Sequence, residues 1–185
     1  MHVINFNNPD QKTAADFHHF FNDELGKILW CELIVREMMP FLIKHCQSEE
    51  LIRMLSIFFL DTERQIAQLE EVFSLLELEL EEKECDIMKG MIDSIWLVSC
   101  STRSKVRDAA ILMIVQRIIG HQVISYRTLS VYLRRMKKPK AVYIVEETLS
   151  EKKNADTKFH NLSIYVNYAA MFSDSYKEGI VKAEN

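Results

Sequence analysis

The sequence predicts an all-α fold: an antiparallel bundle of four long helices with a short extra helix between the second and the third. Apolar residues recur at helical spacing along almost the whole chain, and no segment shows the two-residue alternation of a half-buried strand. Only 4 glycines and 3 prolines occur in 185 residues, too few for the many turns of an all-β protein. A chain of this length suits a single domain over 1–185, with its core at about 10–172 and a polar tail at 173–185.

The first two long helices are predicted over residues 10–46 and 49–76. Pro40 interrupts the apolar pattern of the first helix, and a proline there removes one backbone donor and usually bends the axis. The pattern breaks at Gln47 and Ser48. Ser48 can cap the second helix, because its hydroxyl can accept a hydrogen bond from a backbone N–H that has no partner within the helix.

The short extra helix is predicted over residues 85–100, which carry an apolar stripe. Thr102 or Ser104 then opens the third long helix, which includes residues 107–129 and is apolar on most sides. A helix that is hydrophobic all round is either central in its fold or covered by a partner.

The fourth long helix is predicted to begin at Pro139 and to end near residue 172. Proline suits the first helical position, because the N–H that it lacks would have no helical partner there. The basic run over residues 134–140 could bind phosphate or nucleic acid, but a run of this kind is usually a solvated connection.

Composition and charge argue against several classes of protein. The net charge of −4 gives no electrostatic case for a nucleic-acid partner, because domains that bind nucleic acid usually carry a basic excess. The longest apolar run, 109–115, is far shorter than the ~20 residues of a membrane span, and the N-terminus lacks the pattern of a signal peptide. We therefore expect a cytoplasmic protein with no membrane or nucleic-acid partner.

Cysteines and histidines form no recognisable metal or nucleophile motif in the sequence. The cysteines have no C-x-x-C spacing and lie in predicted helices, which indicates reduced, packed thiols: Cys31, Cys46, Cys85 and Cys100. His121 lies in the most apolar helix and could be a ligand, but a core histidine bonded to a neighbouring side chain is the expected role. His18 and His19 are predicted to lie at the surface.

Five segments of the chain carry a resemblance to a known family. They are ELGKILWCELIVREMMP, TERQIAQLEEVF, KECDIMKGMIDSIW, VRDAAILMIVQRIIGHQVISYRTL and EETLSEKKNADTKFHNL. In order and spacing, across residues 17–167, they resemble the YciE/YciF-type ferritin-like proteins of bacteria. The resemblance implies a ferritin-like bundle, usually a homodimer, that is associated with stress responses and has no established reaction.

The resemblance also implies positions for two metal ions, and most of these positions lack a ligand here. In ferritin-like di-metal bundles two helices each give a Glu and two others each give a Glu-x-x-His pair, and no Glu-x-x-His occurs in this chain. Glu32 matches the first-helix glutamate, whereas four other residues stand where carboxylates are usual: Leu60, Ile119, Gln122 and Lys152. These replacements remove about four negative charges from a site that needs hard, anionic oxygen ligands. We expect no intact di-metal site and no cofactor.

A rebuilt site for iron or another divalent metal is the alternative. Glu63 lies one turn after Leu60, and Asp156 keeps a family carboxylate on the fourth helix. Asp156 and His160 are four residues apart and so share a helix face. Together with Glu32 and Glu63 they could form the single metal site of a binding protein or an oxidase. The more ordinary interpretation is an exposed or hydrogen-bonded pair.

The leading functional hypothesis is a non-enzymatic bundle that acts by dimerisation or by binding an unknown protein partner. The third long helix carries more apolar residues than a bundle needs to bury: Ile111, Leu112, Ile114, Val115, Ile118, Ile119, Val123 and Ile124. A two-fold symmetric homodimer would cover the excess. If apolar side chains fill the former metal cavity, Leu60 and Ile119 are both buried.

Overall fold

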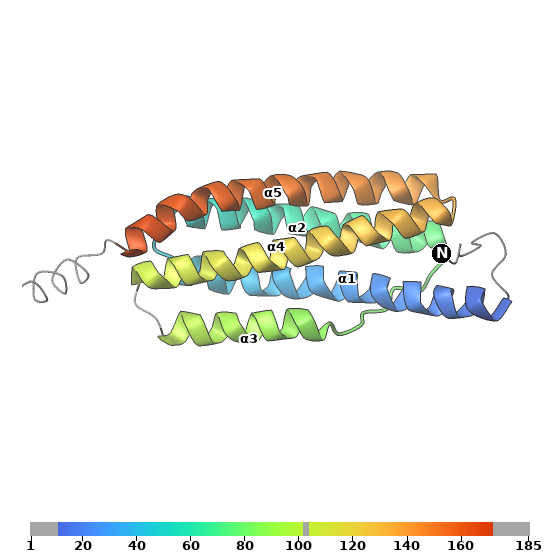
Figure 1. The fold of residues 1–185 in the computed structure, drawn as a ribbon, viewed down its shortest axis with the longest axis horizontal. Coiled ribbons are helices and arrows are strands. Elements are labelled where there is room, and N and C mark those ends of the chain that lie inside the picture. Colours follow the sequence, from blue (N-terminus) through green and yellow to red (C-terminus); the bar gives the residue numbers. More distant parts are fainter. Residues whose placement is uncertain (1–10, 102–103, 172–185) are drawn as a thin grey trace, which may run out of the picture.

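The computed structural model describes residues 11–101 and 104–171, and it folds them into five helices with no strand among them (Figure 1). The helices are α1 (Gln11–His45), α2 (Glu49–Leu76), α3 (Asp86–Ser101), α4 (Ser104–Arg135) and α5 (Pro139–Met171). The all-α fold class and the order of long and short helices are confirmed. The predicted tail at 173–185 lies outside the described residues.

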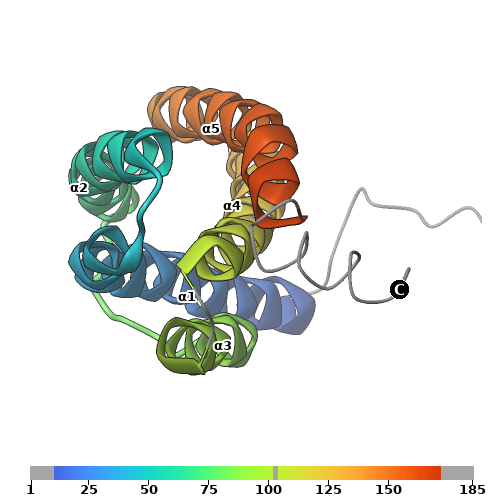
Figure 2. The same cartoon turned by 90° about the vertical axis from the view of Figure 1, so that its left-hand side faces the viewer.

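The four long helices enclose a common interior, and α3 lies outside it. Each long helix packs against two others, in the cyclic order α1, α2, α5, α4, and neighbouring long helices run in opposite directions (Figure 1). Viewed end-on, α3 packs against the outer side of α4 and α1 (Figure 2). The chain therefore crosses from α2 to α4 by a long connection that contains α3.

The connection between α1 and α2 is held by a local cap on α2 and by one side chain of α4. Pro40 lies inside α1, which continues past it to His45. Ser48 is the N-cap of α2, and its hydroxyl accepts a hydrogen bond of 3.3 Å from the Leu51 backbone N–H, as predicted. The buried Asp108 carboxylate of α4 accepts hydrogen bonds from the backbone N–H groups of Ser48 at 2.7 Å and Gln47 at 3.0 Å. This side chain fixes the start of α2 against α4.

The connection from α2 to α3 lies directly on the backbone of α1. The Lys83 N–H donates to the Gly26 carbonyl at 3.2 Å. A Cβ atom at Gly26 would lie 2.7 Å from the Glu81 carbonyl oxygen, so only glycine allows this approach. The contact leads the chain to Cys85, the residue that immediately precedes α3.

Helix α4 is the central helix, and its apolar surface is mostly covered within one chain. Seven of the eight apolar residues that suggested an excess are buried: Ile111, Leu112, Ile114, Val115, Ile118, Ile119 and Val123. Only Ile124 is exposed, with 63% of its surface accessible. The short helix α3 therefore covers part of α4, whose exposed large apolar residues are Val106, Met113, Ile124 and Val131.

By length and composition, Val106–Arg135 is the one helix among the described residues that could cross a membrane. Half of its most apolar window is buried inside the structure, and the core helix of a soluble protein meets the same criterion. It therefore gives only weak evidence for a membrane span.

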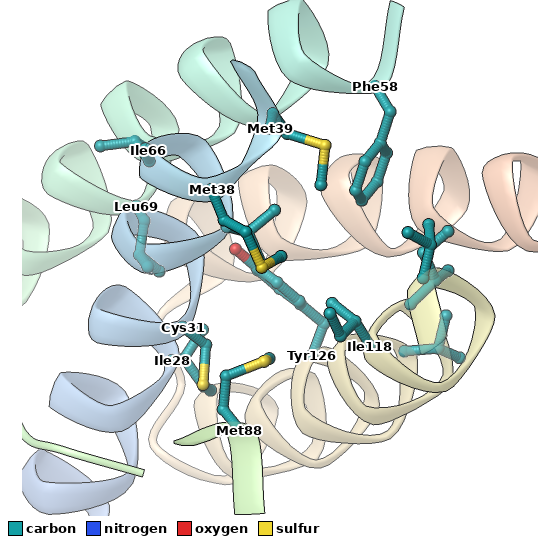
Figure 3. Close-up of a cluster of buried hydrophobic side chains, with 14 of the residues drawn as sticks. Ile28, Cys31, Met38, Met39, Phe58, Ile66, Leu69, Met88, Ile118 and Tyr126 are labelled. Atoms are coloured by element: carbon teal, nitrogen blue, oxygen red, sulfur yellow. The ribbon is translucent and has the colours of Figure 1, made fainter. Parts of the chain in front are cut away.

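The core is continuous from the interior of the long helices to α3. Figure 3 shows the part of it that joins Met39 and Phe58 to Cys31, Met88 and Tyr126. All five side chains are buried, and the cluster is mixed with sulfur-containing and aromatic residues. Two groups of polar residues lie within or beside this core.

Candidate functional site

Six polar or charged side chains lie buried between the long helices. They come from all four of these helices: Glu32 of α1, Thr62 and Gln65 of α2, Gln122 and Tyr126 of α4, and Lys152 of α5. Buried polar groups are costly unless they are paired, so a concentration of them marks a special part of the core.

Lys152 and Glu32 form an ion pair at the centre of this interior. The Lys152 Nζ atom donates to Glu32 Oε2 at 2.8 Å, and both side chains are 0% exposed. The ammonium also lies 5.0 Å from the centre of the Phe58 ring, a cation–π arrangement. Burial lowers the pKa of Lys152, and the Glu32 carboxylate opposes this shift. The pair joins α1 to α5 across the interior.

Several polar atoms around this pair have no hydrogen-bond partner in the protein. They are Glu32 Oε1, Gln65 Oε1, both amide atoms of Gln122 and the Tyr126 hydroxyl. Burial raises the pKa of Tyr126, and the nearby Glu32 carboxylate raises it further. Tyr126 is therefore a neutral phenol beside the ion pair.

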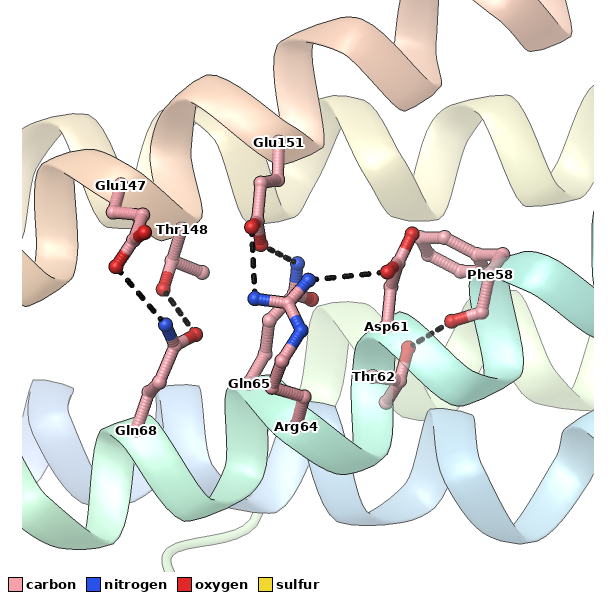
Figure 4. Close-up of polar contacts among 9 residues, drawn as sticks. All are labelled: Phe58, Asp61, Thr62, Arg64, Gln65, Gln68, Glu147, Thr148 and Glu151. Atoms are coloured by element: carbon pink, nitrogen blue, oxygen red, sulfur yellow. Dashed lines mark hydrogen bonds and ion pairs between the residues drawn. The ribbon is translucent and has the colours of Figure 1, made fainter.

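A ladder of polar contacts joins α2 to α5 (Figure 4), and its member Glu151 immediately precedes Lys152 in α5. Glu151 accepts hydrogen bonds from Arg64 at 2.8 Å and from Gln65 Nε2 at 2.9 Å. One helical turn away, the Thr148 hydroxyl donates to Gln68 Oε1 at 3.2 Å. These contacts fix the rotation of α5 on α2 and so direct the neighbouring Lys152 inwards.

A second cluster lies where α1, α4 and the start of α3 meet. The Sγ atoms of Cys31 and Cys85 and a ring nitrogen of His121 all lie within 4.8 Å of one another. The Cys85 Sγ to His121 Nε2 distance is 3.7 Å. Both cysteines are buried free thiols, and His121 is half-buried. Burial lowers the pKa of His121 and raises the pKa of Cys31. At neutral pH the Cys31 thiol and the His121 imidazole are therefore both uncharged.

The chain is similar in sequence to known proteins over most of its length. The sequence model of DUF892, a domain of unknown function, matches residues 16–168. This chain belongs to the DUF892 family. It is 28% identical over 158 residues to Protein YciF of Escherichia coli strain K12, covering 84% of this chain and 93% of YciF. The resemblance seen in the sequence is confirmed.

Two solved structures have a similar fold. The crystal structure of the E. coli stress protein YciF aligns with a TM-score of 0.78 at 25% identity, over 82% of this chain and 96% of that one. YcfI from Rhodopseudomonas palustris aligns with a TM-score of 0.74 at 24% identity, over 84% and 98% of the two chains. The second likeness concerns the fold alone.

The buried polar residues of the interior include few candidate ligands for a pair of metal ions. Of the six side chains named above, Glu32 is the one carboxylate, and the Lys152 ammonium occupies one of its oxygens; the other buried carboxylate of the described residues, Asp108, binds the backbone at the start of α2. Gln122 offers a neutral amide, and Ile119 is fully buried and apolar, as predicted. Two close hard cations need several anionic oxygens, and a fixed ammonium among them is repulsive.

The prediction of which α2 side chains face the core was wrong. Leu60 was expected in the core, but it is 63% exposed, and Glu63 is exposed as well. The inward face of α2 instead carries Phe58, Thr62 and Gln65. Each residue turns an α-helix by about 100°, so an error of two positions moves a side chain to the opposite face.

The residues of the predicted rebuilt site are not brought together. Asp156 and His160 share an exposed face of α5, and Glu63 is exposed on α2, whereas Glu32 is fully buried. Among the described residues, the three potential metal ligands that lie close enough to share an ion are Cys31, Cys85 and His121, and this group includes none of these four side chains. His18 and His19 are exposed, as expected.

The cluster of Cys31, Cys85 and His121 was not found in the sequence. Its members are far apart in the chain and follow no spacing motif, so no local signal connects them. The expectation of free thiols is confirmed for Cys31, Cys46 and Cys85, and His121 does contact a neighbouring side chain, Cys85.

Proposed function

We propose that this DUF892 protein is a non-enzymatic, ferritin-like antiparallel four-helix bundle that acts by self-association and has a stress-related role. The ion pair between Lys152 and Glu32 carries the proposal, because it occupies the interior in which ferritin-like enzymes hold metal. The likeness to the stress protein YciF supports the physiological role.

The connectivity supports the ferritin-like description. One long crossover, which contains α3, joins α2 to α4, and short connections join α1 to α2 and α4 to α5. Ferritin-like bundles have one such long crossover, and their metal ligands project inwards from facing helices. Here Glu32, Gln122 and Lys152 project inwards from α1, α4 and α5. The charges of Glu32 and Lys152 cancel each other without a metal.

A titration with iron tests the loss of the di-metal site. Anaerobic Fe²⁺ is added to the full chain and to Glu32→Gln, which removes the interior carboxylate. We expect the two proteins to bind Fe²⁺ identically and to add nothing to its rate of oxidation on exposure to air. Stoichiometric iron binding that Glu32→Gln abolishes would contradict the proposal.

A groove between α2 and α5 supports self-association. It has a volume of about 630 Å³, and its apolar lining includes Met54, Ile57, Phe159 and Tyr165. Ile57 is 45% and Tyr165 74% exposed, so both side chains present large apolar surface to solvent. An exposed apolar patch of this kind commonly marks an interface.

The charges around the groove favour a second copy of the chain as its occupant. The lining also contains basic and acidic side chains, among them Arg53, Lys158, Glu50 and Asp61. In a two-fold symmetric interface a patch meets itself, so it needs charges of both signs to pair across the axis.

Light scattering of the full chain tests this interface. We expect a particle of twice the 21.7 kDa chain mass for the wild type, and a monomer for Ile57→Glu and Tyr165→Glu. The matched control is Ile124→Glu, which places the same charge on the exposed Ile124 of α4 and should leave the dimer intact. A wild-type monomer at micromolar concentration would refute self-association, and loss of the dimer only in Ile124→Glu would move the interface to α4.

The proposed compartment is the cytoplasm. Cys31, Cys46 and Cys85 are free thiols, and burial raises the pKa of Cys46 to about 12. Free thiols persist where the glutathione and thioredoxin systems keep proteins reduced.

A further inference from the structure

We propose that Cys31, Cys85 and His121 form a binding site for a single zinc ion, separate from the Lys152–Glu32 interior. The three donor atoms come from α1, the residue before α3, and α4, and they all lie within 4.8 Å of one another. A set of two sulfur donors and one imidazole nitrogen binds zinc in preference to iron or magnesium.

The distances are close to those of a tetrahedral zinc site. Zinc binds sulfur at about 2.3 Å and nitrogen at about 2.0–2.1 Å, which places a sulfur and a nitrogen ligand about 3.6 Å apart. Cys85 Sγ and His121 Nε2 are 3.7 Å apart. Two tetrahedral thiolate ligands would be about 3.8 Å apart. No distance between two of these donor atoms exceeds 4.8 Å. Binding of zinc would therefore need the donor atoms to approach one another by about 1 Å at most, which side-chain rotation can supply.

Charge also suits a divalent cation. Two thiolates neutralise the two charges of zinc, and binding releases the thiol protons. The partly buried Glu24, which forms an ion pair with Lys27 at 2.7 Å, also lies near enough to His121 to act on it electrostatically. His121 is itself only half-buried, which gives an ion a path from solvent.

The backbone holds the donors in place before any metal binds. The contact of Lys83 with the Gly26 carbonyl directs the chain to Cys85, and the Lys89 N–H donates to the Cys85 carbonyl at 2.9 Å at the start of α3. Cys31 is fixed within the packed face of α1. Three protein donors leave one position of a tetrahedral ion for water or an exogenous ligand.

Competition with a chromogenic chelator measures the affinity of the reduced, metal-free full chain for Zn²⁺. We expect one ion per chain. Loss of an outer-shell partner of a metal ligand commonly weakens binding 10–100-fold, so loss of a ligand itself in Cys31→Ser, Cys85→Ser or His121→Ala should weaken it by at least about 100-fold. Cys46→Ser, which removes another buried free thiol outside the cluster, should bind like the wild type.

Cobalt gives a second measurement that does not depend on the variants being folded. The wild-type chain loaded with Co²⁺ should show the thiolate charge-transfer absorption and the intense visible bands of a tetrahedral site. Equal zinc affinity in the wild type and in folded Cys31→Ser and Cys85→Ser would overturn the proposal. So would a cobalt form without thiolate absorption, or a Cys31–Cys85 disulfide that forms in preference to metal binding. Because Glu32→Gln should leave zinc binding unchanged, failure here is distinguishable from failure of the interior proposal.

Discussion

Lys152 of α5 and Glu32 of α1 face each other at 2.8 Å in a part of the core that solvent does not reach. Removing two charges from water costs several kcal/mol for each ion, and their attraction offsets this cost only while both are present. The pair therefore makes the core sensitive to the loss of either partner, while its net contribution to stability is small.

Removing one partner should be far worse than removing both. We expect Lys152→Met to lower the free energy of unfolding by about 3–5 kcal/mol, because Glu32 is left buried and unpaired. The double variant Lys152→Met with Glu32→Leu should recover most of this loss. Urea unfolding measures both, with Lys153→Met at the neighbouring exposed position as the control. Additive losses in the double variant would show that the two charges are not coupled.

Tyr126 should make the protein lose stability in alkali. Its folded-state pKa lies above 10.0, the ordinary value, so the unfolded chain loses this proton first as pH rises. The unfolded state then binds fewer protons, and stability falls above about pH 10 by up to about 1.4 kcal/mol per pH unit. Tyr126→Phe should reduce the slope of the unfolding free energy against pH. Urea unfolding at several pH values between about pH 8 and pH 11, a range that spans the ordinary tyrosine pKa, measures this slope.

The same variant should be tolerated at neutral pH, because the Tyr126 hydroxyl lies near the Glu32 carboxylate but makes no hydrogen bond of ordinary geometry with it. Tyr143→Phe, at an exposed tyrosine, is the control and should leave the pH slope as it is in the wild type. An unchanged slope in Tyr126→Phe would mean that this phenol ionises as easily in the folded protein as in the unfolded one.

Ile119 and Leu60 should respond oppositely to truncation. Ile119 is fully buried in the core, so Ile119→Ala should cost about 2–5 kcal/mol of stability. Leu60 is 63% exposed, so Leu60→Ala should change stability by less than about 0.5 kcal/mol. Thermal or urea unfolding compares the two. A large loss in Leu60→Ala would place Leu60 in an interface between chains or in the core.

Glycine at position 26 should be required, whereas glycine at position 90 should not. A Cβ atom at Gly26 would lie 2.7 Å from the Glu81 carbonyl oxygen, so Gly26→Ala must displace the connection to α3 and destabilise the protein by about 1–3 kcal/mol. Gly90 lies on the exposed face of α3 with open space around it, so Gly90→Ala should stabilise by about 0.5–1 kcal/mol. Urea unfolding of both variants tests this contrast, and stabilisation by Gly26→Ala would show that the connection is not held against α1.

Asp108 should stabilise the protein by holding the start of α2 against α4. Its carboxylate accepts hydrogen bonds from the backbone of Gln47 and Ser48, so Asp108→Ala should cost about 2–3 kcal/mol. Asp108→Asn keeps an acceptor and should cost less. Asp93→Ala, on the exposed face of α3, should cost less than about 0.5 kcal/mol in the same unfolding measurement. Equal effects at the two positions would remove Asp108 from this role.

The sequence by itself determined the helices and their order. Ser48 caps α2 and Pro139 opens α5 because these effects involve only neighbouring backbone groups, and α2 ends at Leu76 as predicted. The helical repeat also identified the buried face of α4, including Ile119, because a strongly apolar helix has few ways to face water.

Only the tertiary structure decided which residues meet. The rotation of α2 depends on its contacts with α5, such as Gln65 with Glu151, and this rotation exposes Leu60. The pairing of Lys152 with Glu32 and the cluster of Cys31, Cys85 and His121 join residues far apart in the chain. Helical periodicity specifies which residues share a face of one helix, but the packing of several helices determines the residues that this face contacts.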